Sequence, residues 1–248
     1  MICDVDGCLS PESAGPFDFG ALRAIRRHND LAYQRGDRPV LTPCTGRPLP
    51  FAEAMARLLG NRSVPLIAEN GVWLYWPGRN TYDRDPRIAP EHSRLIHQLS
   101  EWIDARYAAR GVVQQPGKAA SVSLYHDDTS VLHDIVDEIR GEIGERAWPL
   151  RVSMTWLYIN IDFDFIDKGT AIDRLLDALD LKDAKPRLAG VGDTQSDLKI
   201  RSRVGWFACP SNAKDEVKAQ ADYVATEPEA KGVVEIINRI AAVSADTG

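Results

Sequence analysis

Two pairs of aspartates, one near each end of the chain, have the residue type and spacing to do chemistry. Asp4 and Asp6 lie in DVDG, and Asp193 and Asp197 lie in GDTQSD. Carboxylates this close repel one another unless a cation, a shared proton or open water makes their proximity tolerable. Asp193 and Asp197, with Asp4 and the backbone carbonyl of Asp6, would form a hard, all-oxygen ligand set suited to Mg²⁺. The two pairs therefore indicate a magnesium site.

The DVDG pair also suits phosphoryl transfer. A carboxylate can attack the phosphorus of a phosphate monoester and split a very slow hydrolysis into two easier steps through an aspartyl phosphate. We expect Asp4 to be this nucleophile. Asp6 would protonate the leaving oxygen and then accept a proton from the hydrolytic water, and Gly7 would let the backbone turn there. Taken alone, DVDG fits a solvated acidic loop or an Asx turn equally well.

Two further polar clusters suit a phosphate group, namely TGR and DKG. The Thr45 hydroxyl and the backbone N–H groups near Gly46 could bind a phosphate oxygen, although a simple ST-turn would have the same sequence. Arg47 could reach a substrate or be a surface charge. Lys168 begins a predicted helix, where its own charge and the helix dipole both favour an anion. A lone lysine in that place is more often a surface residue.

All four clusters follow predicted strands, and strands alternate with helices at both ends of the chain. The apolar spacing predicts a first helix at 19–36, which Asp18 caps and Gly36 ends. Buried strands are expected at PVLTPC and, on both sides of an Asn-Gly turn, in LIAENGVWLYW. Later strands are expected in RLAGVGD, WFAC and ADYVA, with helices from Lys168 and near 229–243. This alternation is typical of a doubly wound parallel sheet, which gathers function at the carboxyl ends of its strands.

The middle of the chain has a different pattern. A helix at about 88–110 precedes the strands GVVQQ and AASVSLYH, and a helix at about 129–146 precedes the strands LRVSMT and LYINIDF. Two rounds of helix-strand-strand are typical of an α+β layer. We therefore predict an α/β protein with a Rossmann-like doubly wound parallel core, formed by residues 1–80 and 165–248, and an inserted α+β cap at 81–164.

The four clusters, in this order and with an insertion between the second and third, resemble the motifs of haloacid dehalogenase superfamily phosphatases with a type-two cap. That branch includes sugar phosphatases, phosphoglycolate phosphatases and sucrose-phosphate phosphatase. The resemblance implies that Thr45 binds the phosphoryl group, that Lys168 screens Asp4, and that Asp193 ligates Mg²⁺ directly. It implies that Asp197 ligates the metal or holds a metal-bound water. Many cap-bearing relatives have Asn where this chain has Ser196, which puts the role of that position in doubt.

Weaker signals concern the substrate. Asn70 in ENGV and Asn212 in SNAKDEVK resemble family positions near the site, but a hairpin turn and a helix cap explain them as well. The cap should select the substrate, with Lys118 as the candidate contact. Aromatic and polar cap residues would suit a sugar ring, whereas core packing and a solvated loop are the more common reasons for such residues; they are Tyr125, His126, Asp127, Asp128, Trp156 and Tyr158.

Composition excludes several functions. The net charge of −6 over 248 residues offers no basic surface for nucleic acid, and no apolar run approaches the ~20 residues of a membrane helix. Four cysteines without a CxxC pair fit reduced thiols, and we expect no export signal. We expect a cytoplasmic Mg²⁺-dependent phosphomonoesterase, a monomer or homodimer, acting on a small phosphorylated metabolite such as a sugar phosphate. A phosphomutase and a non-catalytic phospho-ligand binder of the same fold are the alternatives.

The start of the chain is unusual for such a fold. Only Met1, Ile2 and Cys3 precede Asp4, whereas members of the family usually have a longer apolar strand there. Either the first strand is short or the natural start lies upstream.

Overall fold

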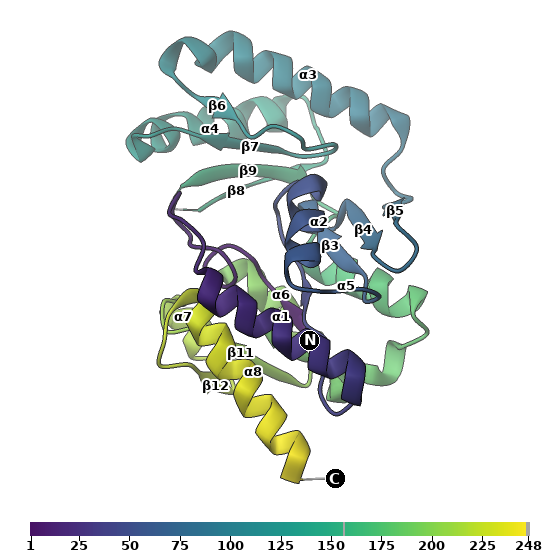
Figure 1. Ribbon diagram of the computed structural model, residues 1–248. Helices are drawn as coiled ribbons and strands as arrows, with labels where there is room; N and C mark the ends of the chain where they lie inside the picture. Colours follow the sequence, from purple (N-terminus) through teal and green to yellow (C-terminus); the bar gives the residue numbers. More distant parts are fainter. Residues whose placement is uncertain (156, 247–248) are drawn as a thin grey trace.

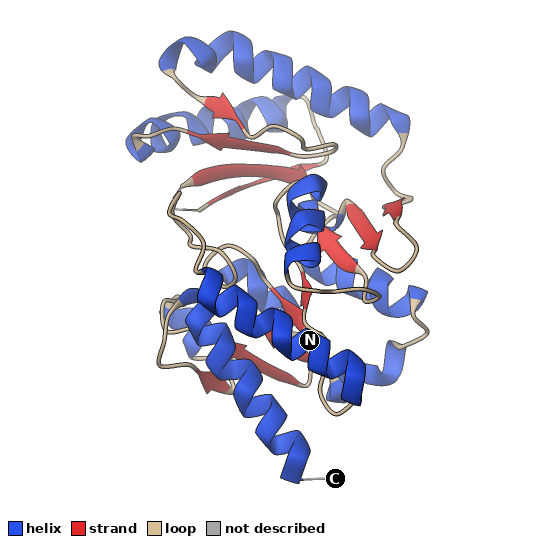
Figure 2. Ribbon diagram, in the orientation of Figure 1, coloured by secondary structure: helices blue, strands red, loops and turns tan. Residues whose placement is uncertain are grey.

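The computed structural model describes residues 1–155 and 157–246, and Figures 1 and 2 show its architecture. The largest sheet is made of β1 (Ile2–Cys3), β2 (Thr42–Pro43), β10 (Ala189–Val191), β11 (Trp206–Cys209) and β12 (Tyr223–Val224). Their spatial order is β12, β11, β10, β1, β2, and all four pairings are parallel. The first strand is thus inside the sheet, and its carboxyl end lies beside those of β2 and β10.

Helices cover both faces of the parallel sheet. They are α1 (Phe19–Arg35), α5 (Lys168–Ala178), α6 (Leu198–Arg201), the short α7 (Asp215–Lys218) and α8 (Glu229–Asp246). Leu22 of α1 and Val233 of α8 share a hydrophobic cluster with Cys3, whereas Ile172 of α5 belongs to a second cluster with Ile2. Because consecutive strand residues point to opposite faces, these two clusters fill the two sides of the sheet. The doubly wound core that the sequence predicts is confirmed.

A small antiparallel sheet adjoins this core. It consists of β3 (Leu66–Ala68), β4 (Trp73–Trp76) and β5 (Thr81–Arg84), with α2 (Leu49–Leu58) packed against it. A parallel bridge between Cys44 and Ile67 joins it to the end of β2. The sequence predicts β3 and β4, whereas α2 and β5 are not predicted. Since β5 pairs with β4, residues 81–84 belong with this sheet, although the predicted cap begins at residue 81.

The inserted segment forms the predicted α+β layer. Its strands are β6 (Val113–Gln114), β7 (Val122–Tyr125), β8 (Leu150–Met154) and β9 (Tyr158–Phe163), and its helices are α3 (Pro90–Tyr107) and α4 (Thr129–Glu145). The antiparallel order is β6, β7, β9, β8. Both helices lie on the side of this sheet away from the parallel sheet, so its other side faces the core (Figure 1). We keep residues 81–164 as the proposed cap, although its first four residues form β5 and pair with β4 in the small sheet.

Short 3-10 segments complete the chain: η1 (Glu69–Gly71), η2 (Ala108–Arg110), η3 (Lys182–Arg187) and η4 (Gln195–Asp197). The predicted helix start at Lys168 is confirmed, because the Asp167 side chain accepts a hydrogen bond from the Thr170 N–H at the start of α5. Asp18 and Gly36 likewise cap α1 as predicted. None of the helices in the two described ranges is long and apolar enough to cross a membrane.

Candidate active site

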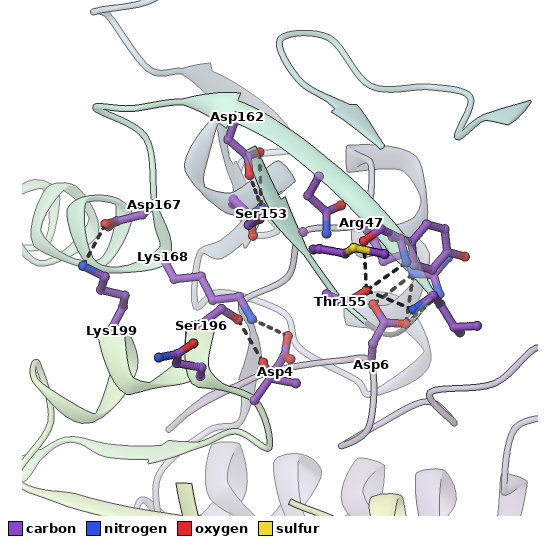
Figure 3. Close-up of a pocket in the computed structure, with 18 of the residues that line it drawn as sticks. Asp4, Asp6, Arg47, Ser153, Thr155, Asp162, Asp167, Lys168, Ser196 and Lys199 are labelled. Atoms are coloured by element: carbon purple, nitrogen blue, oxygen red, sulfur yellow. Dashed lines mark hydrogen bonds and ion pairs between the residues drawn. The ribbon is translucent and has the colours of Figure 1, made fainter. Parts of the chain in front are cut away.

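A cavity of about 560 Å³ lies between the carboxyl ends of the core strands and the open face of the cap sheet (Figure 3). Core and cap both supply its walls. Nine of the residues that the sequence singled out line it, namely Asp4, Asp6, Gly46, Arg47, Asn70, Lys118, Tyr158, Lys168 and Ser196. The order of the strands explains this gathering, because β2, β1 and β10 are neighbours and end at the same edge.

The chain turns sharply as soon as β1 ends. Asp4 still donates its N–H to Val191 of β10 at 3.0 Å, and Asp4 is buried. Gly7 then adopts a positive φ of 74°, and its N–H donates to the Ser10 carbonyl at 2.9 Å. As a result the Asp6 side chain reaches the cavity rim, where 32% of it is exposed. The two acids therefore occupy the same site in different environments.

Gly7 should tolerate no side chain. A Cβ placed on Gly7 would lie 2.1 Å from Asp193 Oδ2, and the positive φ adds strain for any L residue. We expect Gly7→Ala to lower the free energy of unfolding by roughly 2–4 kcal/mol, from about 1 kcal/mol of backbone strain plus overpacking. Urea denaturation measures the change. Gly36→Ala is the matched control, because Gly36 has φ 67° but nothing within 4 Å of its Cβ position. Equal losses in the two variants would contradict the close contact with Asp193.

A buried ion cluster forms the floor of the site. Lys168 Nζ lies 2.8 Å from Asp4 Oδ1 and 2.6 Å from Asp197 Oδ1, and all three side chains are buried. Burial alone would lower the pKa of Lys168, but the charges of Asp197 and Asp4 outweigh it and raise that pKa well above its ordinary value. The lysine therefore stays charged and neutralises part of the acidic cluster.

The cluster still holds more negative than positive charge. Burial, together with the charge of Asp197, raises the pKa of Asp4 to about 7 and the pKa of Asp193 to about 9. Oxygens of these three aspartates lie within 4.8 Å of one another. A divalent cation among them would favour their charged forms, and carboxylate oxygens are the ligands that Mg²⁺ prefers. The residues present thus fit a magnesium ion.

The Asp197 side chain also holds its own loop in place through hydrogen bonds. Its Oδ2 accepts hydrogen bonds from the N–H groups of Asp193 and Thr194 and from the Thr194 hydroxyl, all at 3.0 Å. Its Oδ1 is held by Lys168. Because both oxygens already have partners, the geometry favours Asp197 as the residue that fixes the loop of Asp193. Ser196, whose role the sequence left open, lines the cavity, and its hydroxyl lies 3.0 Å from that of Thr194.

Arg47 connects the core motifs with the cap. Its Nε lies 2.9 Å from both carboxylate oxygens of Asp6, and its Nη2 lies 2.7 Å from Asp6 Oδ1. The same guanidinium lies 5.7 Å from the ring centre of Tyr158 on β9. Such a bidentate pair fixes the orientation of a carboxylate. Arg47 is therefore a residue of the cavity wall rather than an isolated surface charge.

Some predicted residues do not reach the cavity wall. Thr45 is fully buried, and its hydroxyl accepts the N–H of Arg47 at 3.0 Å. The Asn212 amide donates to the Gly7 carbonyl at 2.9 Å and accepts the N–H of Glu229 at 2.7 Å. Both side chains hold the loops of other motif residues. In the cap, Asp128 caps α4, Tyr125 donates to Asp127, and Trp156 lies outside the described residues.

Sequence reasoning missed several cavity residues on the cap strands. Ser153, Asn160 and Asp162 line the cavity, and the Asn70 amide donates to Asp162 at 3.2 Å. The available signal was the alternation of polar residues in LRVSMT and LYINIDF, which marks the open face of the sheet. The buried Glu69 was also missed, because it follows a strand without any charged neighbour.

Comparisons with known proteins relate this chain to one family of hydrolases. A family model described as haloacid dehalogenase-like hydrolase matches residues 112–237. Phosphoglycolate phosphatase 1 of Saccharolobus solfataricus is 30% identical over 244 residues, which cover 97% of this chain and 94% of the relative. A phosphoglycolate phosphatase of Methanospirillum hungatei is 29% identical over 243 residues, covering 96% and 94%.

Solved structures share the fold at lower identity. Thermoplasma acidophilum 0175 superposes with a TM-score of 0.73 at 19% identity, and 96% of each chain is covered. The sucrose-phosphatase of Synechocystis sp., solved with sucrose and phosphate, gives a TM-score of 0.63 at 18% identity, again over 96% of each chain. With relatives matched over nearly their whole length, the chain belongs to the haloacid dehalogenase-like hydrolases and is a phosphatase.

Proposed function

We propose that the protein is a Mg²⁺-dependent phosphomonoesterase that hydrolyses a small phosphorylated metabolite through an aspartyl phosphate on Asp4. The buried Asp4–Lys168–Asp197 cluster beside Asp193 carries this proposal. It holds a carboxylate against a fixed cation at the bottom of a cavity open to small molecules. A bound Mg²⁺ would neutralise the charge of the carboxylate and of the phosphoryl oxygens. Asp4, Asp193 and the Asp6 carbonyl are its proposed ligands, with Asp197 in support.

The proposed reaction has two steps. Asp4 Oδ attacks phosphorus, the bond from phosphorus to the ester oxygen breaks, and Asp6 gives its proton to that oxygen. Asp6 then takes a proton from water as the water attacks phosphorus, which releases phosphate and restores Asp4. Arg47 holds the Asp6 carboxyl at the exposed rim of the cavity, where solvent can supply the proton for the first step. The buried Lys168 stays charged through both steps.

The cavity favours a small acid over a sugar ring as the alcohol part of the substrate. Tyr158 is the single aromatic side chain among the described lining residues, and Arg47 already lies over its ring. An aromatic ring presents a large apolar face, and Arg47 already covers that of Tyr158. The relatives matched over nearly the full length are named phosphoglycolate phosphatases. We therefore propose 2-phosphoglycolate as the first substrate to test, ahead of sugar phosphates.

Metal removal should stop the reaction. We expect dialysis against EDTA to reduce phosphate release to background, and added Mg²⁺ to restore it. Mg²⁺ at about 100 times its Kd should also add about 2.7 kcal/mol of stability, which raises the Tm of the metal-free protein by roughly 5–10 °C. This shift should disappear in Asp193→Asn and persist in Asp177→Asn, a control on an exposed carboxylate of α5. Activity that survives chelation would contradict the proposal.

The two alternative functions, a phosphomutase and a non-catalytic binder, predict different amounts of released inorganic phosphate. A phosphomutase would transfer the phosphoryl group back to a sugar, so it would release little inorganic phosphate from a single substrate. A non-catalytic binder would release none from a broad panel of phosphate esters with Mg²⁺.

A further inference from the structure

The loop between β6 and β7 brings one lysine of the cap to the cavity. Lys118 lines the cavity together with Asp4 and Arg47, and it is partly buried. Its Nζ donates to the Ser123 hydroxyl at 2.5 Å, and that hydroxyl donates to Asn160 Oδ1. No carboxylate of the described chain lies within ion-pair distance of Nζ. An ammonium group has three donors, so Lys118 can still bind an anion.

The charges around Lys118 also favour the binding of an anion. Burial lowers the pKa of Lys118, and the charges of Asp162 and Glu69 offset only part of this effect, while Arg47 adds to it. Both of these carboxylates have other partners: Asp162 accepts from Asn70, and Glu69 accepts from the loop itself. An anionic ligand group in the cavity would therefore find a lysine whose charge is incompletely balanced.

A buried carboxylate of the core holds the loop of Lys118 in place. Glu69 is fully buried, and its Oε1 accepts the N–H groups of Ala119 at 2.9 Å and Ala120 at 2.7 Å and the Ser121 hydroxyl at 2.9 Å. Its backbone N–H also donates to the Arg47 carbonyl at 2.9 Å. Glu69 thus ties the three residues that follow Lys118 to the core motif that carries Arg47.

We propose that Lys118 is a specificity-determining residue that binds a second anionic group of the substrate, a carboxylate, and that Glu69 is the residue that positions it. The inference rests on the proposed phosphatase function and deepens it by naming the substrate class. Substrates would be small phosphate monoesters whose alcohol part carries a carboxylate. The phosphoryl end would lie on Lys168 and Asp4 and the carboxylate end on Lys118, and all three residues line the same cavity.

A matched pair of substrates tests the role of Lys118. 2-Phosphoglycolate carries the carboxylate, and 2-hydroxyethyl phosphate has a hydroxyl in its place. In the wild type, kcat/KM should be higher for 2-phosphoglycolate than for 2-hydroxyethyl phosphate. The ratio of the first value to the second should fall about 10- to 100-fold in Lys118→Met, as expected for the loss of one charged hydrogen bond. Lys199→Met is the control, because Lys199 also lines the cavity but is exposed and paired with Asp167 (Figure 3). Its ratio should change less than about threefold.

Glu69→Gln tests the positioning role. The amide keeps the size of the side chain but removes an acceptor for the loop N–H groups, so the ratio should fall as in Lys118→Met. In the double variant with Lys118→Met the ratio should fall no further, a non-additivity that a purely structural role would not produce. If Glu69→Gln does not fold, Ser121→Ala removes one bond to Glu69 and should lower the ratio about two- to fivefold.

Three outcomes of the ratio measurements would overturn the inference. One is a wild-type ratio near unity, and another is a Lys118→Met ratio within about threefold of the wild type. The third is an equal loss on both substrates in Glu69→Gln and Ser121→Ala. A wild-type protein that hydrolyses only larger phosphate esters would overturn this inference and leave the proposed function intact. A protein that hydrolyses no phosphate ester would overturn both.

Discussion

Asp4→Asn should abolish phosphate release, with a loss of at least about 10³-fold in kcat/KM, and should leave the protein folded. An amide is a far weaker nucleophile than a carboxylate, so no aspartyl phosphate can form. The amide oxygen can still accept the hydrogen bond from Lys168, and the loss of one negative charge relieves the repulsion in the acidic cluster. We expect the free energy of unfolding to stay within about 1 kcal/mol of the wild type.

The measurement is phosphate release from 2-phosphoglycolate with Mg²⁺, alongside urea denaturation. Asp6→Asn is the informative companion, because it keeps the proposed nucleophile but removes the proposed acid and base. With a substrate whose leaving group needs no proton, such as 4-nitrophenyl phosphate, the aspartyl phosphate of this variant should form and persist long enough for acid quenching and borohydride reduction. The reduction would convert residue 4 into homoserine detectable by mass spectrometry. More than about 1% of wild-type activity in Asp4→Asn would eliminate Asp4 as the nucleophile.

The core of the site could be predicted from the sequence because its parts are local. DVDG, TGR, DKG and GDTQSD each follow a strand, and a parallel sheet aligns the ends of its strands. Asp4, Lys168 and Asp193 therefore come together without knowledge of any side-chain contact. The helix signals were equally local, as the Asp18 and Gly36 caps of α1 illustrate.

Physical features of α2 and β5 explain why the sequence does not predict these two elements. α2 begins just after Pro48 and has Pro50 in its first turn, so RPLPF resembles a loop, although proline is well tolerated in the first turn of a helix. β5 is mostly exposed and shows no apolar alternation, so its TYDR sequence carries no strand signal. Tertiary pairing with β4 creates that strand.

Contacts between core and cap could not be predicted, because they join residues that share no local pattern. The hydrogen bonds from Ala120 to Glu69 and from Asn70 to Asp162 each cross from one layer to the other. The same limit applies to Thr45 and Asn212, whose side chains support neighbouring loops instead of lining the cavity. Motif positions can thus be located from sequence, whereas their division into cavity-wall and supporting residues requires the packed structure.

Lys168→Met should have the largest combined effect on stability and activity. Lys168 is the only cation paired with Asp4 and Asp197 in the part of the chain that the structure describes. Its loss would leave two buried carboxylates without a positive partner, which costs roughly 3–5 kcal/mol in the free energy of unfolding. Phosphate release should fall by at least about 10²-fold, because the screening of Asp4 against the phosphoryl group is lost.

A second substitution separates the effect of Lys168→Met on stability from its effect on activity. Asp197→Asn in the Lys168→Met background removes one of the two buried carboxylates that have lost their cation. The double variant should therefore recover about half of the lost stability in urea denaturation. It should not recover activity, since Asp4 would still lack its cation. If the double variant recovered both stability and activity, Lys168 would have a structural role alone. A Lys168→Met variant as stable as the wild type would contradict the buried ion cluster. Asp197→Asn alone is the reference for turnover, because Asp197 also holds the loop of Asp193. Turnover that persists in Asp197→Asn and is absent from the double variant, although the double variant has regained stability, would place Lys168 in the chemistry.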